Sequence, residues 1–91
     1  MKEKKINEKW FVYIVECSDK TIYTGISNDV DARLAKHNSG KGAKYTKGRT
    51  PVILKAKFEY DNKSEASKAE YAFKNLTKQQ KLEMVHIYKH K

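Results

Sequence analysis

Two tyrosines lie ten positions apart in the stretch VYIVECSDKTIYTGIS, on either side of a short polar break. Tyr13 and Tyr23 share one face of a hairpin if the loop between the strands has three residues, and take opposite faces if it has two. Lys20 is a poor residue for the positive φ of a tight two-residue turn, which favours the longer loop. Two interpretations stay open, because such phenols either fill a core, which the pattern alone favours, or meet at a site for proton transfer.

A second group of polar residues lies on the helix predicted over 29–38. Arg33 and His37 are four positions apart and flank its apolar seam, so they are neighbours. Only two of the chain's twenty basic residues are arginines. A forked guanidinium retained at position 33 suits bidentate contact with a phosphate, and the same holds less firmly for Arg49. The alternative is that these are solvated surface charges.

One carboxylate lies at the margin of a buried helical stripe. Glu70 follows Ala66 by four positions and precedes Phe73 by three, within a helix predicted over 63–76. Its partner is either a lysine, which the pattern favours, or a divalent metal such as magnesium, which binds oxygen ligands. Glu65 flanks the other margin, so the pattern does not choose between the two acids. His86 and His90 are interpreted as surface residues.

The composition indicates one small domain with an anionic partner. The 91-residue chain carries a net charge of +9, which favours nucleic acid, with an anionic membrane surface as the rival. It has no apolar run of the roughly 18 residues that a membrane span needs and no signal peptide, so we expect a cytoplasmic protein without a membrane partner. Its one cysteine, Cys17, is expected to be buried. We predict a flexible arm over 1–9 and a single domain over 10–91.

The elements that must position these residues follow from the hydrophobic pattern. Asn28 is the expected N-cap of the first helix, Pro51 opens the third strand, and Thr77 with Gln80 resembles a capping box for a last helix. The stretch 39–50 is glycine-rich and basic, which is typical of an exposed loop. The order β-β-α-β-α-α predicts an α+β domain with a three-stranded, mainly antiparallel sheet flanked by helices. The predicted strands are 10–17, 21–26 and 52–60, and the predicted helices are 29–38, 63–76 and one that starts at Thr77.

Together these residues resemble a known family. Tyr13 in VYI, then Tyr23-Thr24-Gly25, then Arg33, His37 and Glu70 are similar to the motifs of the GIY-YIG nuclease superfamily, especially its small stand-alone bacterial members. The resemblance covers about Trp10 to Leu82, and the joint pattern is specific although no single element is. The residues that flank the tyrosines in both motifs differ from the family pattern. Both tyrosines and Gly25 match it, and Gly25 is expected to have a structural role.

The resemblance implies a GIY-YIG endonuclease-like fold and a metal-dependent phosphodiesterase. By position, Tyr13 and Tyr23 would activate and orient the attacking water, and Arg33 would contact the scissile phosphate. Glu70 would bind one divalent ion, Mg²⁺ or alternatively Mn²⁺. His37 would assist proton transfer or contact the phosphate. Many relatives carry an asparagine after this glutamate, and Asn75 is a candidate only by proximity.

The expected function is endonucleolytic hydrolysis of DNA, with RNA as the alternative substrate. Phenols that act as bases at neutral pH need nearby cations to stabilise the phenolate, and we expect this basic chain to supply them. Flanking phosphates are expected to bind four residues of the basic loop, namely Lys41, Lys44, Lys47 and Arg49. A protein partner is a further expected source of target specificity. The alternatives are a non-catalytic nucleic-acid-binding module on the same scaffold and a protein whose basic face binds an acidic partner.

Overall fold

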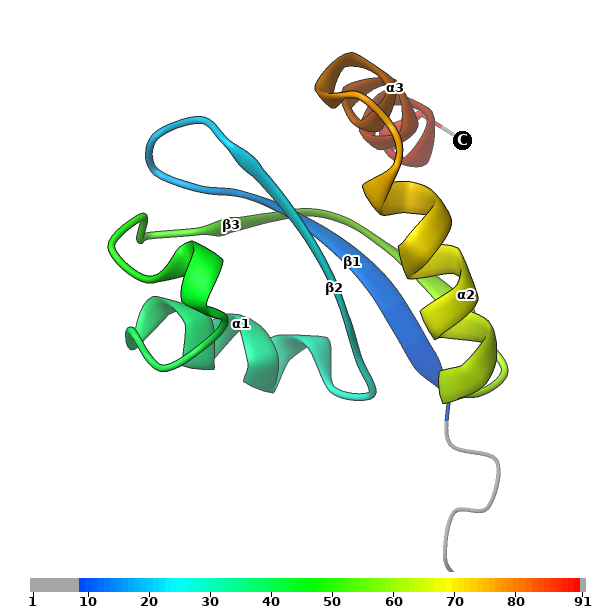
Figure 1. The fold of residues 1–91 in the computed structure, drawn as a ribbon, viewed down its shortest axis with the longest axis horizontal. Helices are drawn as coiled ribbons and strands as arrows, with labels where there is room; N and C mark the ends of the chain where they lie inside the picture. The colour runs from blue at the N-terminus through cyan, green and yellow to red at the C-terminus, as the bar shows by residue number, and fades with distance from the viewer. Residues whose placement is uncertain (1–8, 91) are drawn as a thin grey trace, which may run out of the picture.

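The protein forms a three-stranded sheet with helices on both faces. The structure is a computed structural model that describes residues 9–90 (Figure 1). The strand order is β2-β1-β3 and both pairings are antiparallel, so β1 is the central strand. The predicted order β-β-α-β-α-α and the α+β class are confirmed. The elements are β1 (Trp10–Glu16), β2 (Ile22–Ser27), α1 (Val30–Asn38), the 3-10 helix η1 (Lys44–Thr46), β3 (Ile53–Tyr60), α2 (Lys63–Lys74) and α3 (Lys78–Lys89).

The loop of the β1–β2 hairpin sets which face each tyrosine occupies. The backbone N–H of Cys17 donates to the Thr21 carbonyl at 2.8 Å, which leaves three residues, 18–20, in the loop. Tyr13 pairs with Gly25 and Val15 with Tyr23, so both tyrosines lie on one face, as the longer loop predicted. Lys20 nevertheless adopts a φ of 73°. The reason is that a three-residue loop usually ends in a left-handed residue, so the longer loop did not spare Lys20 a positive φ.

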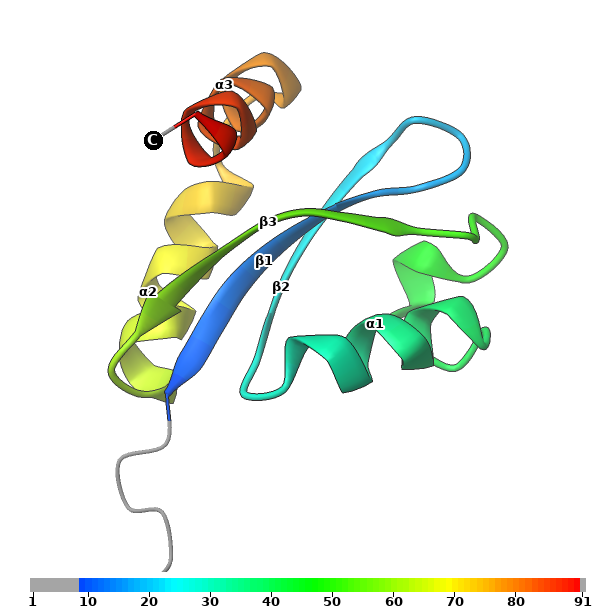
Figure 2. The same cartoon turned by 180° about the vertical axis from the view of Figure 1, so that it is seen from behind.

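Each face of the sheet has its own apolar core. On one face Tyr13, Val15 and Cys17 pack with residues of α1 and of the segment before β3. On the other face Ile14 and Ala56 pack with Phe73 and Val85 from α2 and α3. Figures 1 and 2 show α1 and α3 on opposite sides of the sheet, with α2 beside the end where β1 begins. Cys17 is buried, as expected.

Polar caps fix the starts of the helices. Asp29, rather than the predicted Asn28, caps α1, because its carboxylate accepts from the Ala32 N–H at 3.1 Å. Asn62 caps α2 in the same way. The predicted capping box of α3 is confirmed, since the Thr77 hydroxyl and the Gln80 amide each accept from the other residue's backbone N–H. Helix α2 ends at Lys74, two residues before the predicted end.

The basic loop over 39–50 is folded back onto the domain rather than fully exposed. It contains η1, in which Thr46 is completely buried. The Asn38 side chain accepts from the Val52 N–H at 2.6 Å and donates to the Val52 carbonyl at 3.2 Å, which closes the loop. The backbone N–H of Ser18 donates to the Arg49 carbonyl at 2.8 Å and joins the loop to the hairpin turn. The prediction of an exposed loop missed these contacts because they involve distant residues.

Two expectations concern the ends of the chain and the membrane. The predicted arm over 1–9 lies outside the described residues except for Lys9, whose ammonium donates to Asp61 at 2.9 Å. Within residues 9–90, no helix combines the length and apolar character needed to cross a membrane.

Candidate active site

Both tyrosines and the histidine meet between β1, β2 and α1. Tyr13 lies on the central strand, Tyr23 on the neighbouring edge strand, and His37 near the end of α1. The ring centroids of Tyr13 and Tyr23 are 6.3 Å apart, and the His37 ring lies 5.9 Å from the first and 5.4 Å from the second. Tyr13 and His37 are each only 1% exposed. Both interpretations that the sequence left open therefore hold for the tyrosines. They fill the core, and they also converge with His37 in one cluster.

The His37 ring is held at both nitrogens. Its Nε2 lies 2.8 Å from the Tyr13 hydroxyl, and its Nδ1 lies 2.8 Å from the Thr46 hydroxyl. The backbone N–H of Ala43 also donates to Nδ1, at 3.3 Å. Since α1 ends one residue later and the chain turns back through η1, the loop reaches the ring that α1 projects into the core.

Two hydrogen-bond patterns satisfy these partners of the His37 ring. With the ring proton on Nε2, the ring donates to the Tyr13 oxygen and Nδ1 accepts from the Ala43 N–H. With the proton on Nδ1, the ring donates to the Thr46 oxygen, the Thr46 hydroxyl donates to the Ala43 carbonyl at 2.9 Å, and Nε2 accepts from the Tyr13 hydroxyl. Burial, followed by the nearby Arg33 charge, lowers the pKa of His37, which also favours the neutral ring.

Two glycines allow this close packing. Gly25 lies opposite Tyr13 on β2, and a Cβ there would come within 2.6 Å of the Tyr13 hydroxyl oxygen. A Cβ on Gly42 would collide with the His37 ring and would lie 2.7 Å from the His37 Cα. The structural role predicted for Gly25 thus has a steric reason, whereas Gly42 was not singled out in the sequence.

Arg33 borders a basic hollow beside the cluster. The hollow has a volume of about 290 Å³ and is lined by Tyr23, Arg33, Lys36, His37, Lys41, Gly42 and Ala43. The Arg33 guanidinium donates to the Ile26 carbonyl at 3.5 Å and its charge acts on both tyrosines and on His37. This arrangement suits a phosphate, because a fixed guanidinium and two lysines face a space that is open to solvent.

Glu70 is the acid of α2 that acts on both phenols. Its charge raises the pKa of Tyr13 and of Tyr23 through a minor contribution to each. The Glu70 side chain is 23% exposed, and its carboxylate pairs with the ammonium of Lys74 at 3.3 Å. Glu65 instead pairs with Lys68 on the same helix. The structure therefore separates two acids that the sequence pattern left equivalent, and it also gives Glu70 the lysine partner that the pattern favoured.

The donor set around Glu70 fits one kind of metal. Among residues 9–90, no three His, Cys, Asp or Glu side chains form a group of metal ligands. Magnesium often binds through one or two carboxylates and completes its shell with water and substrate oxygens. A single half-buried carboxylate beside two phenols and a basic hollow is compatible with that mode.

Burial dominates the acidity of both phenols. Burial, with a smaller contribution from Tyr23, raises the pKa of Tyr13 to about 12, although Arg33 acts in the opposite direction. Burial also raises the pKa of Tyr23, against the effect of Lys74. The expectation that nearby cations stabilise the phenolate is wrong for the protein alone, because desolvation outweighs them. Both tyrosines are neutral at pH 7.

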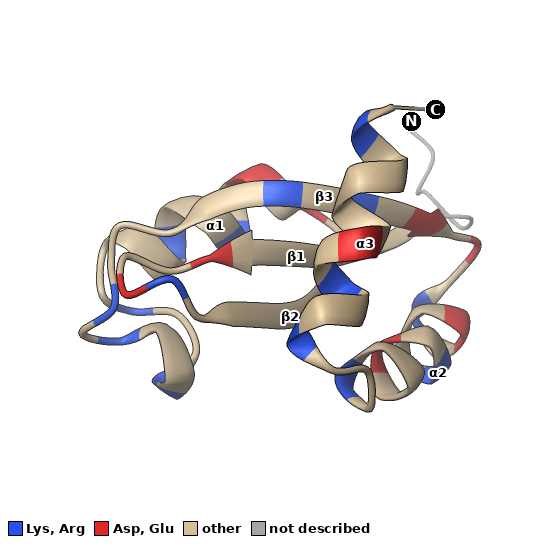
Figure 3. Ribbon diagram, turned by 90° about the horizontal axis from the view of Figure 1, so that it is seen from above, with Lys and Arg blue, Asp and Glu red and all other residues tan. Residues whose placement is uncertain are grey.

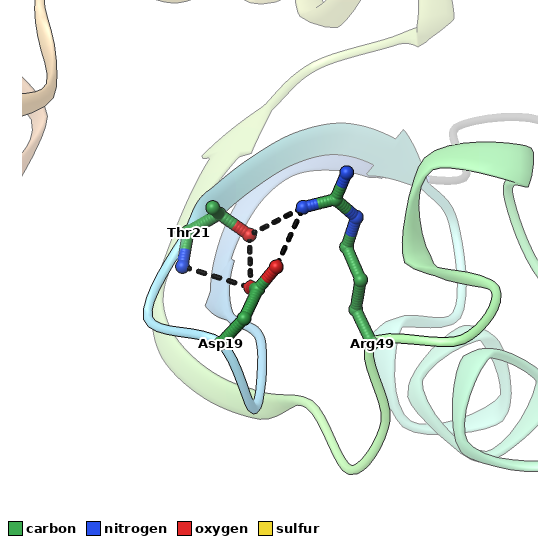
Figure 4. Close-up of polar contacts among 3 residues, drawn as sticks. All are labelled: Asp19, Thr21 and Arg49. Carbon is green, nitrogen blue, oxygen red and sulfur yellow. Dashed lines mark hydrogen bonds and ion pairs between the residues drawn. The ribbon is translucent and has the colours of Figure 1, made fainter.

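The four residues assigned to phosphate binding in the basic loop differ in their surroundings. Lys41 lines the basic hollow, whereas Lys44, the first residue of η1, and Lys47, which follows η1, are exposed. Arg49 donates to the Asp19 carboxylate at 2.7 Å and to the Thr21 hydroxyl at 3.4 Å, so it connects the loop to the hairpin turn (Figure 4). Phosphate binding by this set stays a prediction, and the structure adds an intramolecular role for Arg49.

Sequence reasoning missed three residues that support the cluster. The Tyr45 ring stacks on Tyr23 at 5.7 Å, and the Arg49 guanidinium lies 4.4 Å from the Tyr45 ring centre. Thr46 supports His37, and Lys74 lies 5.9 Å from the Tyr23 ring. Tyr45 and Thr46 are consecutive in η1, so this one turn contacts both sides of the cluster. The alternation of small and basic residues in the loop gave no sign that Tyr45 or Thr46 contacts the cluster.

Asn75 was a candidate site residue only by its proximity to Glu70 in the sequence. Its side chain instead donates to the Tyr71 carbonyl of α2.

The comparison with known families agrees with this geometry. Residues 9–83 match the model of the GIY-YIG catalytic domain. The match covers both strands of the hairpin, α1, the basic loop and α2, which together carry every residue of the cluster. The chain therefore belongs to the GIY-YIG catalytic domain family, a nuclease family, as the sequence motifs indicated.

Within this family, the chain is similar to the small UPF0213 proteins. It is 58% identical over 78 residues to UPF0213 protein SERP0126 of Staphylococcus epidermidis, a match that covers 86% of this chain and 95% of that protein. The solution NMR structure of UPF0213 protein BH0048 from Bacillus halodurans has a TM-score of 0.56 and 47% identity, over 87% of this chain and 84% of the other. That of protein EF2693 from E. faecalis has a TM-score of 0.56 and 40% identity, over 96% and 93%.

Proposed function

We propose that this protein is an endonuclease that hydrolyses phosphodiester bonds of DNA with the help of one divalent metal ion, Mg²⁺ or Mn²⁺. The observation that supports it most is the convergence of Tyr13, Tyr23 and His37 beside the basic hollow that Arg33 borders. Family membership supports a nucleic-acid substrate. The choice of DNA over RNA and the single metal ion are parts of the proposal.

Some residues of the proposed site supply positive charge, and others orient the attacking water. Arg33 neutralises the scissile phosphate, which is anionic and otherwise repels a nucleophile. Tyr13, whose hydroxyl lies 2.8 Å from His37, orients the attacking water. Tyr23 lies at the edge of the hollow and is placed to contact the same water or the phosphate. A divalent ion on Glu70 would supply further positive charge to the transition state.

The cleavage test uses two acids of the same helix. Purified protein with Mg²⁺ or Mn²⁺ is expected to cut at least one member of a panel of single-stranded, branched and duplex DNA and RNA. Glu70→Gln is expected to abolish this cleavage while it retains binding, because the carboxylate is removed without a change in side-chain shape. Glu65→Gln is the matched control and is expected to cleave like the wild type. Equal cleavage by Glu70→Gln and the wild type would refute the proposal.

One observation favours a second function, a non-catalytic nucleic-acid-binding module. Glu70 is already paired with Lys74, and Tyr13 has a pKa of about 12, so neither group is primed for catalysis in the protein alone. This alternative predicts salt-sensitive binding and no cleavage of any substrate with any divalent metal. Cleavage that depends on Glu70 would exclude it.

A further inference from the structure

The ring of Tyr23 borders a second hollow besides the one that contains Arg33. This second hollow has a volume of about 370 Å³ and is lined by Ile22, Tyr23, Thr24, Tyr45, Lys74 and Lys81. The first hollow belongs to α1 and the basic loop, whereas the cations of the second come from α2 and α3. Figure 3 shows basic residues at the end of α2 and on the first turns of α3, beside β2 and apart from those of the loop. Tyr23 thus lies between two separate basic regions.

Two lysines of the second hollow lie close together without sufficient acid to neutralise them. Lys74 pairs with Glu70 and lies over the Tyr23 ring at 5.9 Å. The Lys81 ammonium makes no ion pair or hydrogen bond among the described residues, although the backbone N–H of Lys81 donates to the Thr77 carbonyl at 3.0 Å. Burial, followed by the charge of Lys74, lowers the pKa of Lys81. An uncompensated cation beside another is stabilised by a bound anion.

Thr24, which also lines this hollow, carries a buried hydroxyl without a partner. Thr24 is 2% exposed, and its Oγ1 is the one buried side-chain oxygen or nitrogen among the described residues that has no hydrogen-bond partner. A buried polar group left unpaired costs roughly 1–3 kcal/mol, so partners for such groups are usually found in ligands or water. This observation is independent of the lysines and also indicates a polar ligand.

We propose that Lys74 and Lys81 form a second phosphate subsite, so that a bound nucleic-acid strand crosses Tyr23 from the Arg33 hollow to the α2–α3 side. The inference rests on the proposed function, because it assumes that the scissile phosphate lies near Arg33. Successive phosphates of one strand then occupy the two basic regions, with Tyr23 between them. Lys81, which the sequence did not single out, becomes a binding residue that positions the strand without taking part in the chemistry.

The test measures how binding depends on salt, with EDTA present so that no cleavage occurs. The affinity of a labelled single-stranded oligonucleotide is measured by fluorescence anisotropy over a range of salt concentrations. Each phosphate contact contributes about 0.7 to the slope of log K against log salt on single strands, so Lys81→Gln is expected to reduce the slope by about that amount. Lys78→Gln, an exposed lysine one turn earlier that does not line the hollow, is expected to keep the wild-type slope.

The outcomes separate this inference from the proposed function. A reduced slope for Lys81→Gln with normal Lys78→Gln binding supports the subsite, even if the wild type never cleaves DNA. A wild type that cleaves, with equal slopes for Lys81→Gln and the wild type, overturns the subsite and leaves the proposed function standing. Equal losses in both lysine variants also overturn it, because they indicate a general effect of surface charge.

Discussion

The hydroxyl of Tyr13 and the Nε2 of His37 lie 2.8 Å apart in the protein interior. They come from the central strand and from the last turn of the helix that follows the hairpin, 24 residues apart in the chain. The contact joins the two motifs that carry the family resemblance and orients the phenol. Four of the five predictions that follow depend on this contact or on the residues that support it.

Gly25 determines how closely β2 approaches the Tyr13 ring. Gly25→Ala is expected to destabilise the protein by about 1–3 kcal/mol, because the new Cβ would overlap the phenol and the ring has to move. Urea denaturation followed by circular dichroism measures this change in the free energy of unfolding. Gly40→Ala is not a suitable control, because Gly40 has a φ of 85°, so Gln79→Ala at an exposed position of α3 is used. A stability of Gly25→Ala equal to that of the wild type would contradict the packing.

Thr46 is expected to hold the His37 ring rather than to contact substrate. Thr46→Val removes the hydroxyl 2.8 Å from Nδ1 and is expected to cost about 1–3 kcal/mol of unfolding free energy. Thr46→Ser keeps the hydroxyl and is the matched control. The nitrogen chemical shifts of His37, measured by NMR, are expected to report the same tautomer in the wild type and in Thr46→Ser, and to change in Thr46→Val. Unchanged shifts in Thr46→Val would show that Thr46 does not position the ring.

The neutral state of His37 predicts a pH dependence. Its pKa is lowered in the folded protein, so below its ordinary value of 6.5 the unfolded chain binds more protons than the folded one. The stability that this group contributes is therefore present above pH 6.5 and lost as the pH falls through its folded pKa. The difference in unfolding free energy between wild type and His37→Gln is expected to shrink between pH 7 and pH 5. A difference that stays constant over this range would mean that His37 titrates equally in both states.

The ion pair between Arg49 and Asp19 connects the basic loop to the hairpin turn. Because both side chains are partly exposed, a double-mutant cycle with Arg49→Ala and Asp19→Ala is expected to give only a small favourable coupling energy. Chemical denaturation of the four proteins supplies this value. If the single variants instead add without coupling, the contact in Figure 4 does not stabilise the loop.

The fold and most residues of the cluster could be predicted from the sequence, because both depend on local signals. The alternation of apolar residues, the capping box at Thr77 and the turn residues predicted every α-helix and strand to within a few positions, but not the 3-10 helix η1. The shared face of Tyr13 and Tyr23 followed from the length of one loop. Arg33 and His37 followed from helical spacing and from their resemblance to family motifs.

The remaining features depend on contacts that no local pattern encodes. The basic loop was expected to be exposed, yet its Thr46 reaches the core, because His37 offers a buried nitrogen that needs a partner. The phenols were expected to be surrounded by stabilising cations, yet burial raises the pKa of Tyr13 to about 12. Desolvation depends on the packing of β1, β2 and α1 together, so counting charged residues in the sequence could not predict it.

The measurement that tests the account most directly is single-turnover cleavage by Tyr13→Phe, with protein in excess over a substrate that the wild type cuts. This variant removes one oxygen from the cluster and keeps the ring that fills the core. Because positioned acid–base groups contribute roughly 10²–10⁴-fold to a rate, Tyr13→Phe is expected to cleave at least about 100-fold more slowly while its affinity for the same substrate in EDTA stays unchanged. Tyr71→Phe, on the exposed face of α2, serves as the control and is expected to cleave normally. Cleavage by Tyr13→Phe at the wild-type rate would contradict the assignment of this cluster as the active site.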